Sequence, residues 1–226
     1  MAGDGTATPD PDMLKLLASA VRFHDDYTAS GRQARAKLWR HVDGPSPTGK
    51  ISASDAERWV CRMLQCPPAL VPRSTVQRLF HAAATDGKAG EPSAGQERPQ
   101  VPGHIEPGMA FWRLVLLVSC YVEVFVAFCP SDGFNARIPP DEFARLAGFL
   151  CRWGVPAVSA RQASEEAVQL FGRAARWDQL LEWGMERLGE AIQQGGGAFF
   201  RHLERVLTGE EDAPRPRPVA IPLALL

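Results

Sequence analysis

The chain has no surplus of positive charge, since 25 Lys and Arg residues stand against 26 Asp and Glu residues and the formal net charge is -1. A nucleic-acid-binding protein normally concentrates a basic surplus on one face. Lysine is scarce, and the arginines are scattered and form no basic block. The sequence therefore argues against a nucleic-acid partner.

Short motifs of catalytic chemistry are also missing from the chain. It contains no GxSxG nucleophile elbow, no Walker phosphate loop and no HExxH pair, and its five histidines lack the spacing of a zinc site. The five cysteines are odd in number and include no CxxC pair. Each lies in an apolar, helix-like context, which is typical of small buried residues in a reducing interior. We expect no enzymatic activity and a cytoplasmic location.

Targeting features are absent from the first residues. Acidic residues and prolines stand where a signal peptide needs basic and then apolar residues, and position 2 is Ala rather than the Gly of an acylation signal. The apolar run from Phe111 to Phe128 is interrupted by Arg113 and Glu123, so it falls short of the ~20 residues of a spanning helix. We interpret it as a buried core helix and expect no transmembrane segment.

Helical periodicity dominates the rest of the chain and predicts an all-α fold. Capping boxes are expected at Ser54 with Glu57 and at Ser159 with Gln162. Gly, Pro and polar residues predict a surface loop over 85–104, and three glycines predict a hinge at 195–197. The predicted helices cover residues 13–27, 32–42, 54–65, 74–84, 107–129, 139–154, 159–172, 177–194 and 198–207.

Two turns share one pattern, in which a helix is followed by a polar turn, a single aliphatic residue and an acidic helix start. This is the arrangement of a calcium-binding EF-hand, whose 12-residue loop supplies oxygen ligands at set positions. With Ile51 and Ile138 as the aliphatic residues, two candidate ligand sets follow. The first loop offers Asp43, Ser46, Thr48, the carbonyl of Lys50, Ser52 and Asp55, and the third offers Ser131, Asn135 and Glu142.

Both turns leave alternatives open. The first is an ordinary helix connection, a degenerate EF-hand, or a working calcium or magnesium site, and Asp rather than Glu at the last ligand position favours weak binding. Glu142 either ligates a metal or stabilises the start of a helix through the helix dipole. Any calcium is expected to bind weakly, and no other cofactor is expected.

The chain resembles the calflagins, the flagellar calcium-binding proteins of trypanosomes, over roughly residues 30 to 185. Tyr121 and Glu123 match the central Tyr and Glu of that family's helix between the second and third hands. Four stretches carry the resemblance: Leu38 to Asp43 with Thr48 to Asp55, Ile105 to Phe128, Ser131 to Gly154, and Trp177 to Trp183.

The resemblance implies two pairs of EF-hands. It also implies a flagellar location as an alternative to the general cytoplasm. The chain departs from the family in its fourth hand, where 171–177 leaves no room for a loop and Gln179 stands near the position of the bidentate Glu. In the second hand, Met109 or Ala110 occupies the last ligand position. The implied division is a disordered lead at 1–12, an N-terminal pair with an extra helix at 13–129, a degenerate C-terminal pair at 130–194, and a hinge, short helix and Pro-rich tail at 195–226.

The function implied is that of a calcium-sensor relative with degenerate loops that acts as a protein-interaction module. EF-hand pairs expose a hydrophobic groove that accepts apolar helical segments. The occupant is predicted to be a partner helix or the protein's own C-terminal segment, which includes the apolar run 219–226. A working sensor that uses the first loop and a purely structural helical scaffold are the alternatives.

Overall fold

The computed structural model describes residues 9–21, 29–43, 49–66, 68, 71–85, 103–129 and 137–210. Within these ranges the chain forms eight helices and no strand, which confirms the all-α prediction for the described part. The helices are α1 (Pro11–Val21), α2 (Ala29–Asp43), α3 (Ala53–Met63), α4 (Arg73–Thr85), α5 (Met109–Phe128), α6 (Pro140–Arg152), α7 (Ala160–Phe171) and α8 (Trp177–Thr208).

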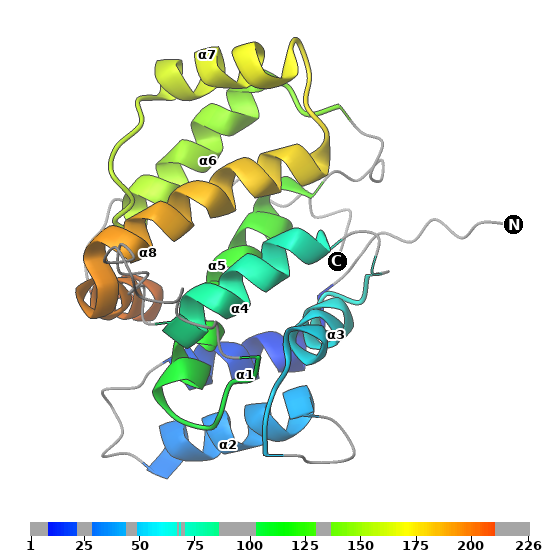
Figure 1. The fold of residues 1–226 in the computed structure, drawn as a ribbon, viewed down its shortest axis with the longest axis vertical. Helices are drawn as coiled ribbons and strands as arrows, with labels where there is room; N and C mark the ends of the chain where they lie inside the picture. The colour runs from blue at the N-terminus through cyan, green and yellow to red at the C-terminus, as the bar shows by residue number, and fades with distance from the viewer. Residues whose placement is uncertain are drawn as a thin grey trace, which may run out of the picture.

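The helices surround α5, which runs through the middle of the molecule (Figure 1). Helices α6 and α7 pack together at one end of the long axis and α1 and α2 at the other, while α4 and α8 lie between them. The buried apolar residues form one connected core. By length and composition α5 alone among the described helices is apolar enough to cross a membrane, but 78% of its most apolar window is buried inside the protein. It has the burial of a core helix, as its interrupted pattern predicts.

Two helix starts show how local chemistry sets the boundaries. The capping box at Ser159 is confirmed, because its Oγ accepts from the backbone N–H of Gln162 and its own N–H donates to the Gln162 side chain. The predicted box at Ser54 is wrong. The N-cap of α3 is Ser52, which is extended (φ -91°, ψ 166°) and pairs with Asp55.

Three helices end in the same way, in a Schellman motif. In this motif the residue just past the helix adopts a left-handed conformation, and the next N–H returns to a carbonyl five residues earlier. At the end of α6, Gly154 has φ +83° and the N–H of Val155 donates to the carbonyl of Leu150 at 3.0 Å. Helix α8 ends likewise at Gly209, and α3 ends likewise at Gln65, which has φ +48° although it is not glycine.

The predicted hinge lies inside α8. The predicted separate helices 177–194 and 198–207 are two arms of this one helix, which is kinked at Gly196 (φ 49°, ψ -135°). The second arm buries Phe199, Phe200 and Leu203 in the core. The centre of the Phe200 ring lies 6.3 Å from the centre of the Trp112 ring on α5. The Arg113 guanidinium lies 5.5 Å from the centre of the same Phe200 ring. The end of the described chain is therefore part of the core.

Candidate functional site

Two short antiparallel bridges join the ends of four loops. Ile51 exchanges both backbone hydrogen bonds with Ile105, each 2.8 Å long, and Ile138 does the same with Ala175 at 2.9 Å. All four side chains are buried. The EF-hand pattern predicts that Ile51 and Ile138 lie in short extended segments, each beside the aliphatic position of a partner loop, and both bridges have this arrangement.

The bridges divide the helices into two pairs of helix–loop–helix units. The first bridge joins the loop between α2 and α3 to the loop between α4 and α5. The second joins the loop between α5 and α6 to the loop between α7 and α8. Helix α5 therefore leaves the second unit and enters the third, and among the described helices only α1 and the second arm of α8 stand outside the repeated arrangement.

The candidate ligands of the first loop are only partly within the described residues. Ser46 and Thr48 lie outside them, as does the side chain of Asp43, the last residue of α2. Lys50 is exposed, and its Nζ lies 4.0 Å from Oε1 of Glu106 in the partner loop. Ser52 and Asp55 are brought together at the start of α3.

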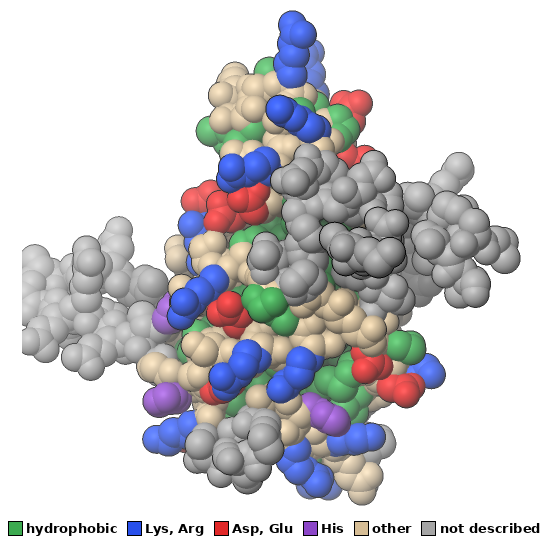
Figure 2. All heavy atoms as spheres, turned by 90° about the vertical axis from the view of Figure 1, so that its right-hand side faces the viewer, with side chains coloured by type: hydrophobic (Ala, Val, Ile, Leu, Met, Phe, Trp, Pro, Cys, Tyr) green, Lys and Arg blue, Asp and Glu red, His purple; other side chains and the backbone are tan. Residues whose placement is uncertain are grey.

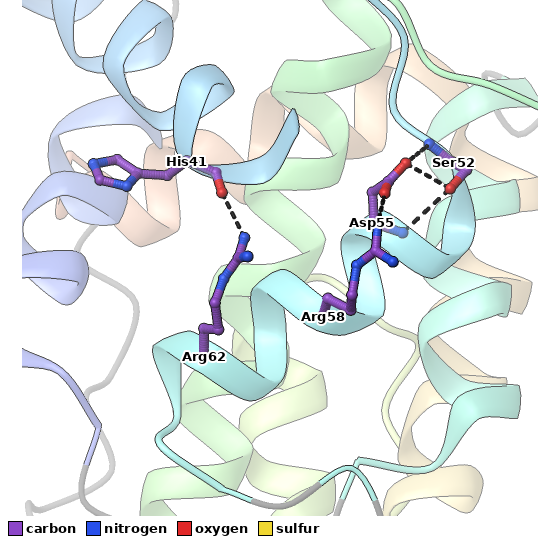
Figure 3. Close-up of polar contacts among 5 residues, drawn as sticks. All are labelled: His41, Ser52, Asp55, Arg58 and Arg62. Carbon is purple, nitrogen blue, oxygen red and sulfur yellow. Dashed lines mark hydrogen bonds and ion pairs between the residues drawn. The ribbon is translucent and has the colours of Figure 1, made fainter. Parts of the chain in front are cut away.

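The carboxylate of Asp55 is fully engaged within its own helix (Figure 3). Its Oδ2 accepts from the N–H of Ser52 at 2.9 Å and from the Ser52 hydroxyl at 2.6 Å, and Oδ1 forms an ion pair with Arg58. Burial alone would raise the pKa of Asp55, but the Ser52 hydrogen bonds and the Arg58 charge outweigh it and hold the pKa below its ordinary value. This carboxylate stays ionised, and it is already satisfied without a metal.

The side chains at the equivalent positions of the third and fourth units are engaged in the same local way. Glu142, in the first turn of α6, forms an ion pair with Arg145. The side-chain oxygen of Gln179 accepts from the N–H of Arg176 at 2.8 Å and caps α8. The remaining third-loop candidates, Ser131 and Asn135, lie outside the described residues.

Helices α2 and α3 are also tied to each other by a contact between a side chain and the backbone. Arg62, in the last turn of α3, donates from Nη2 to the backbone carbonyl of His41 at 2.6 Å (Figure 3). That carbonyl belongs to the last turn of α2, where the helix leaves its final carbonyls without partners. The contact holds the two helices of the first unit together.

The two residues singled out in the central helix have different surroundings. Tyr121 is fully buried in the core. Glu123 forms an ion pair with Arg152 of α6. Burial raises the pKa of Glu123, and the Arg152 charge opposes that rise. Tyr121 is therefore part of the core, and Glu123 joins α5 to α6.

A cleft lies between α4 and α8 that the sequence did not predict. It has a volume of about 440 Å³, and its apolar lining includes Leu79, Ala82, Met185 and Ile192. Near it, the Ser74 hydroxyl donates to Oε1 of Glu182 at 2.7 Å and joins the same two helices. No sequence signal could locate this cleft, because its two walls lie about a hundred residues apart in the chain.

The surface around these elements is mixed in charge. Figure 2 shows acidic, basic and apolar side chains interspersed over the described part of one face. Within the described ranges, no three His, Cys, Asp or Glu side chains are placed to hold one metal ion. The arrangement thus offers paired loops, locally satisfied carboxylates and an apolar cleft. Comparison with family models, curated proteins and solved structures finds no match to this chain.

Proposed function

We propose that this protein is an EF-hand-type relative of the calcium sensors, similar to the calflagins, whose loops have lost most of their metal ligands. The observation that carries the proposal is the repeated pair of bridges, Ile51 with Ile105 and Ile138 with Ala175. In paired EF-hands the aliphatic residues of two neighbouring loops pair in this manner. A chance helical bundle has no reason to build the same two-residue bridge twice between loops.

The state of the loop carboxylates supports weak metal binding. Calcium takes six to eight oxygen ligands, and sensor-type loops rely on a bidentate carboxylate at the last position. Asp55 and Glu142 are each paired with an arginine three residues further on. A metal would have to compete with those arginines, and at Asp55 also with two hydrogen bonds from Ser52. The alternative of a working sensor requires the first loop to win that competition.

Calcium titration by isothermal calorimetry tests this part of the proposal on the full chain. We expect no measurable binding, or weak binding that Asp55→Asn abolishes and Glu142→Gln leaves unchanged. The two variants are matched because each removes one charge beside one arginine. A sub-micromolar dissociation constant that Asp55→Asn abolishes would contradict degenerate loops and favour a working sensor. A loss of binding in Glu142→Gln alone would place calcium in the third loop and would also contradict the proposal.

The interaction role rests on the cleft between α4 and α8. Its apolar walls include Met185, and methionine adapts readily to different partners. We propose that the cleft receives an amphipathic helical segment, with the protein's own residues 219–226 as the internal competitor for that place. Those residues lie outside the described ranges.

Truncation after Glu210 tests the internal competitor without removing any buried residue of α8. We expect the 1–210 chain to bind more of a hydrophobic dye than the 1–226 chain, at an unchanged melting temperature. Ala82→Asp in the 1–210 chain should abolish the extra dye signal at an unchanged melting temperature, because Ala82 lines the cleft and is only half-buried. Equal dye binding by the two chains would reject the internal competitor, and indifference to Ala82→Asp would reject the cleft and favour the structural scaffold.

A further inference from the structure

The Schellman motif at the end of α3 contains two cysteines at its two key positions. Cys61 provides the carbonyl that accepts the returning hydrogen bond, and Cys66 provides the N–H that donates it, with N and O 3.1 Å apart. A second bond, from the N–H of Gln65 to the carbonyl of Arg62 at 3.2 Å, completes the motif. This hydrogen-bonding pattern holds the backbones of the two cysteines close together.

Side chains at these two positions of a Schellman motif commonly contact each other, normally as an apolar pair. Helix α6 follows this rule with Leu150 and Val155, which are both buried. In α3 the two positions carry thiols instead. A disulfide needs cysteine Cα atoms about 4.4 to 6.8 Å apart and side chains directed at each other. The motif brings the two backbones together, and the Cys61 and Cys66 thiols lie within hydrogen-bonding reach of each other.

The two thiols differ from the other cysteines of the described chain. Each is 8% exposed, so each lies at the edge of the core, whereas Cys120 is 0% exposed. Cys151 is exposed, but its neighbours in the helix offer no second thiol. Cys129, at the end of α5, lies near enough to act electrostatically on Cys66. No three-ligand metal group is formed among the described residues, so the chemistry open to these thiols is that of a pair.

We propose that Cys61 and Cys66 are a thiol modification site at which a peroxide forms a reversible intramolecular disulfide. In the first step the Cys61 sulfur attacks the peroxide, the O–O bond breaks, and a sulfenic acid and one water form. In the second step the Cys66 sulfur attacks the sulfenic sulfur, the S–O bond breaks, and a second water leaves. The two thiols lose two electrons and two protons in total, and the peroxide is reduced to water.

The order of the steps follows from the interaction between the thiols. A hydrogen bond from the Cys66 thiol stabilises the thiolate of Cys61 and lowers the pKa of Cys61. This effect is larger than the rise in pKa that burial causes. The same interaction, with burial, raises the pKa of Cys66 and keeps its proton in place. A thiolate is the form that attacks a peroxide. Cys61 is therefore the first thiol to react, and Cys66 is the resolving thiol.

Peptide mapping tests the proposal on the full chain. A Cys151→Ser background removes the exposed thiol, which would otherwise link two molecules. The protein is treated with hydrogen peroxide, the remaining free thiols are alkylated, and the protein is cut with trypsin without reduction. Cleavage after Arg58, Arg62 and Arg73 places Cys61 in peptide 59–62 and Cys66 in peptide 63–73. We expect these two peptides to appear as one linked species that dithiothreitol separates.

Two variants make the assignment sharp. With Cys66→Ser the link should disappear and a sulfenic acid at Cys61 should be captured by dimedone, while Cys129→Ser should leave the link unchanged. A link from either cysteine to Cys129 would overturn the assignment. The proposal would also be overturned if Cys61 and Cys66 could still be fully alkylated after peroxide treatment. The dose used is one that oxidises Cys151 in the unaltered chain. Unaltered circular dichroism before treatment confirms that each variant has folded.

Discussion

Gly154 lies directly against the imidazole ring of His202. A Cβ atom added to Gly154 would stand 2.6 Å from Cδ2 and 2.8 Å from Nε2 of that ring, closer than such atoms ever approach. The glycine also has φ +83°, a left-handed conformation that L side chains rarely adopt. The contact joins the end of α6 to the second arm of α8. Replacing one hydrogen of Gly154 by a methyl group therefore affects both helices.

Gly154→Ala is therefore expected to destabilise the protein. The left-handed backbone alone costs roughly 1 to 2 kcal/mol for a residue with a Cβ, and displacement of the His202 ring adds to that cost. Gly148→Ala is the matched control, because Gly148 lies inside α6, is exposed and has open space around it. The control should stabilise the helix by up to about 1 kcal/mol. Urea unfolding followed by circular dichroism measures both, and equal effects would contradict the contact.

The start of α3 gives a second prediction, because two serines compete for the capping role in the sequence. Ser52→Ala should lower the free energy of unfolding by about 0.5 to 2 kcal/mol, since it removes the cap from the Asp55 N–H. Ser54→Ala should change it by less than about 0.5 kcal/mol, because Ser54 is exposed and follows the cap. Thermal unfolding of the two variants decides the matter, and the reverse order would mean that the helix starts later.

The Asp55 carboxylate should make stability depend on pH in the acid range. Its folded pKa is lower than its unfolded value, so its contribution is complete above an unfolded pKa of about 3.9 and is lost as the pH falls through the folded pKa. Asp55→Asn should therefore lower the free energy of unfolding at pH 7, and it should lower it by less near pH 3. Urea midpoints measured at both values test it. A constant difference between variant and wild type would show that the charge is not the cause.

The second arm of α8 is expected to be essential to the core. Phe200→Ala should destabilise the protein by about 3 to 5 kcal/mol, because the fully buried ring packs against Trp112 and leaves a cavity when removed. Leu170→Ala on α7 is the control, since Leu170 is 59% exposed and should change stability by less than about 1 kcal/mol. Chemical denaturation compares the two. Similar small losses would place the arm outside the cooperative core.

Periodicity located the helices because most of them bury one face, and the lone isoleucines located the bridges. The exact start of α3 was beyond the sequence for a physical reason. Both Ser52 and Ser54 have an acidic residue three positions later, so both satisfy a capping box. The bridge at Ile51 decides between them, because it keeps the chain extended up to Ser52 and lets the helix begin at Ala53.

Other features depend on backbone conformation that the sequence pattern does not predict. Cys151 was predicted to be buried but is exposed, because it follows the buried Leu150 by one residue and a helix turns 100° per residue. The predicted start of the central helix at residue 107 is wrong by two residues, since Gly108 has φ +129° and α5 begins at Met109. The approach of Cys61 to Cys66 depends on a left-handed Gln65, which sequence alone would assign to glycine.

Helix α5, which belongs to both bridged pairs, also constrains the order of events during synthesis. Its apolar surface is covered by α1 and α4, which are made before it, and by α6 and α8, which are made after it. The second covering group is complete only when residues 129 to 208 have left the ribosome. At 5 to 20 residues per second this takes roughly 4 to 16 seconds. For that interval only α1 and α4 can cover α5, and the side of the helix that packs against α6 and α8 stays exposed in the nascent chain.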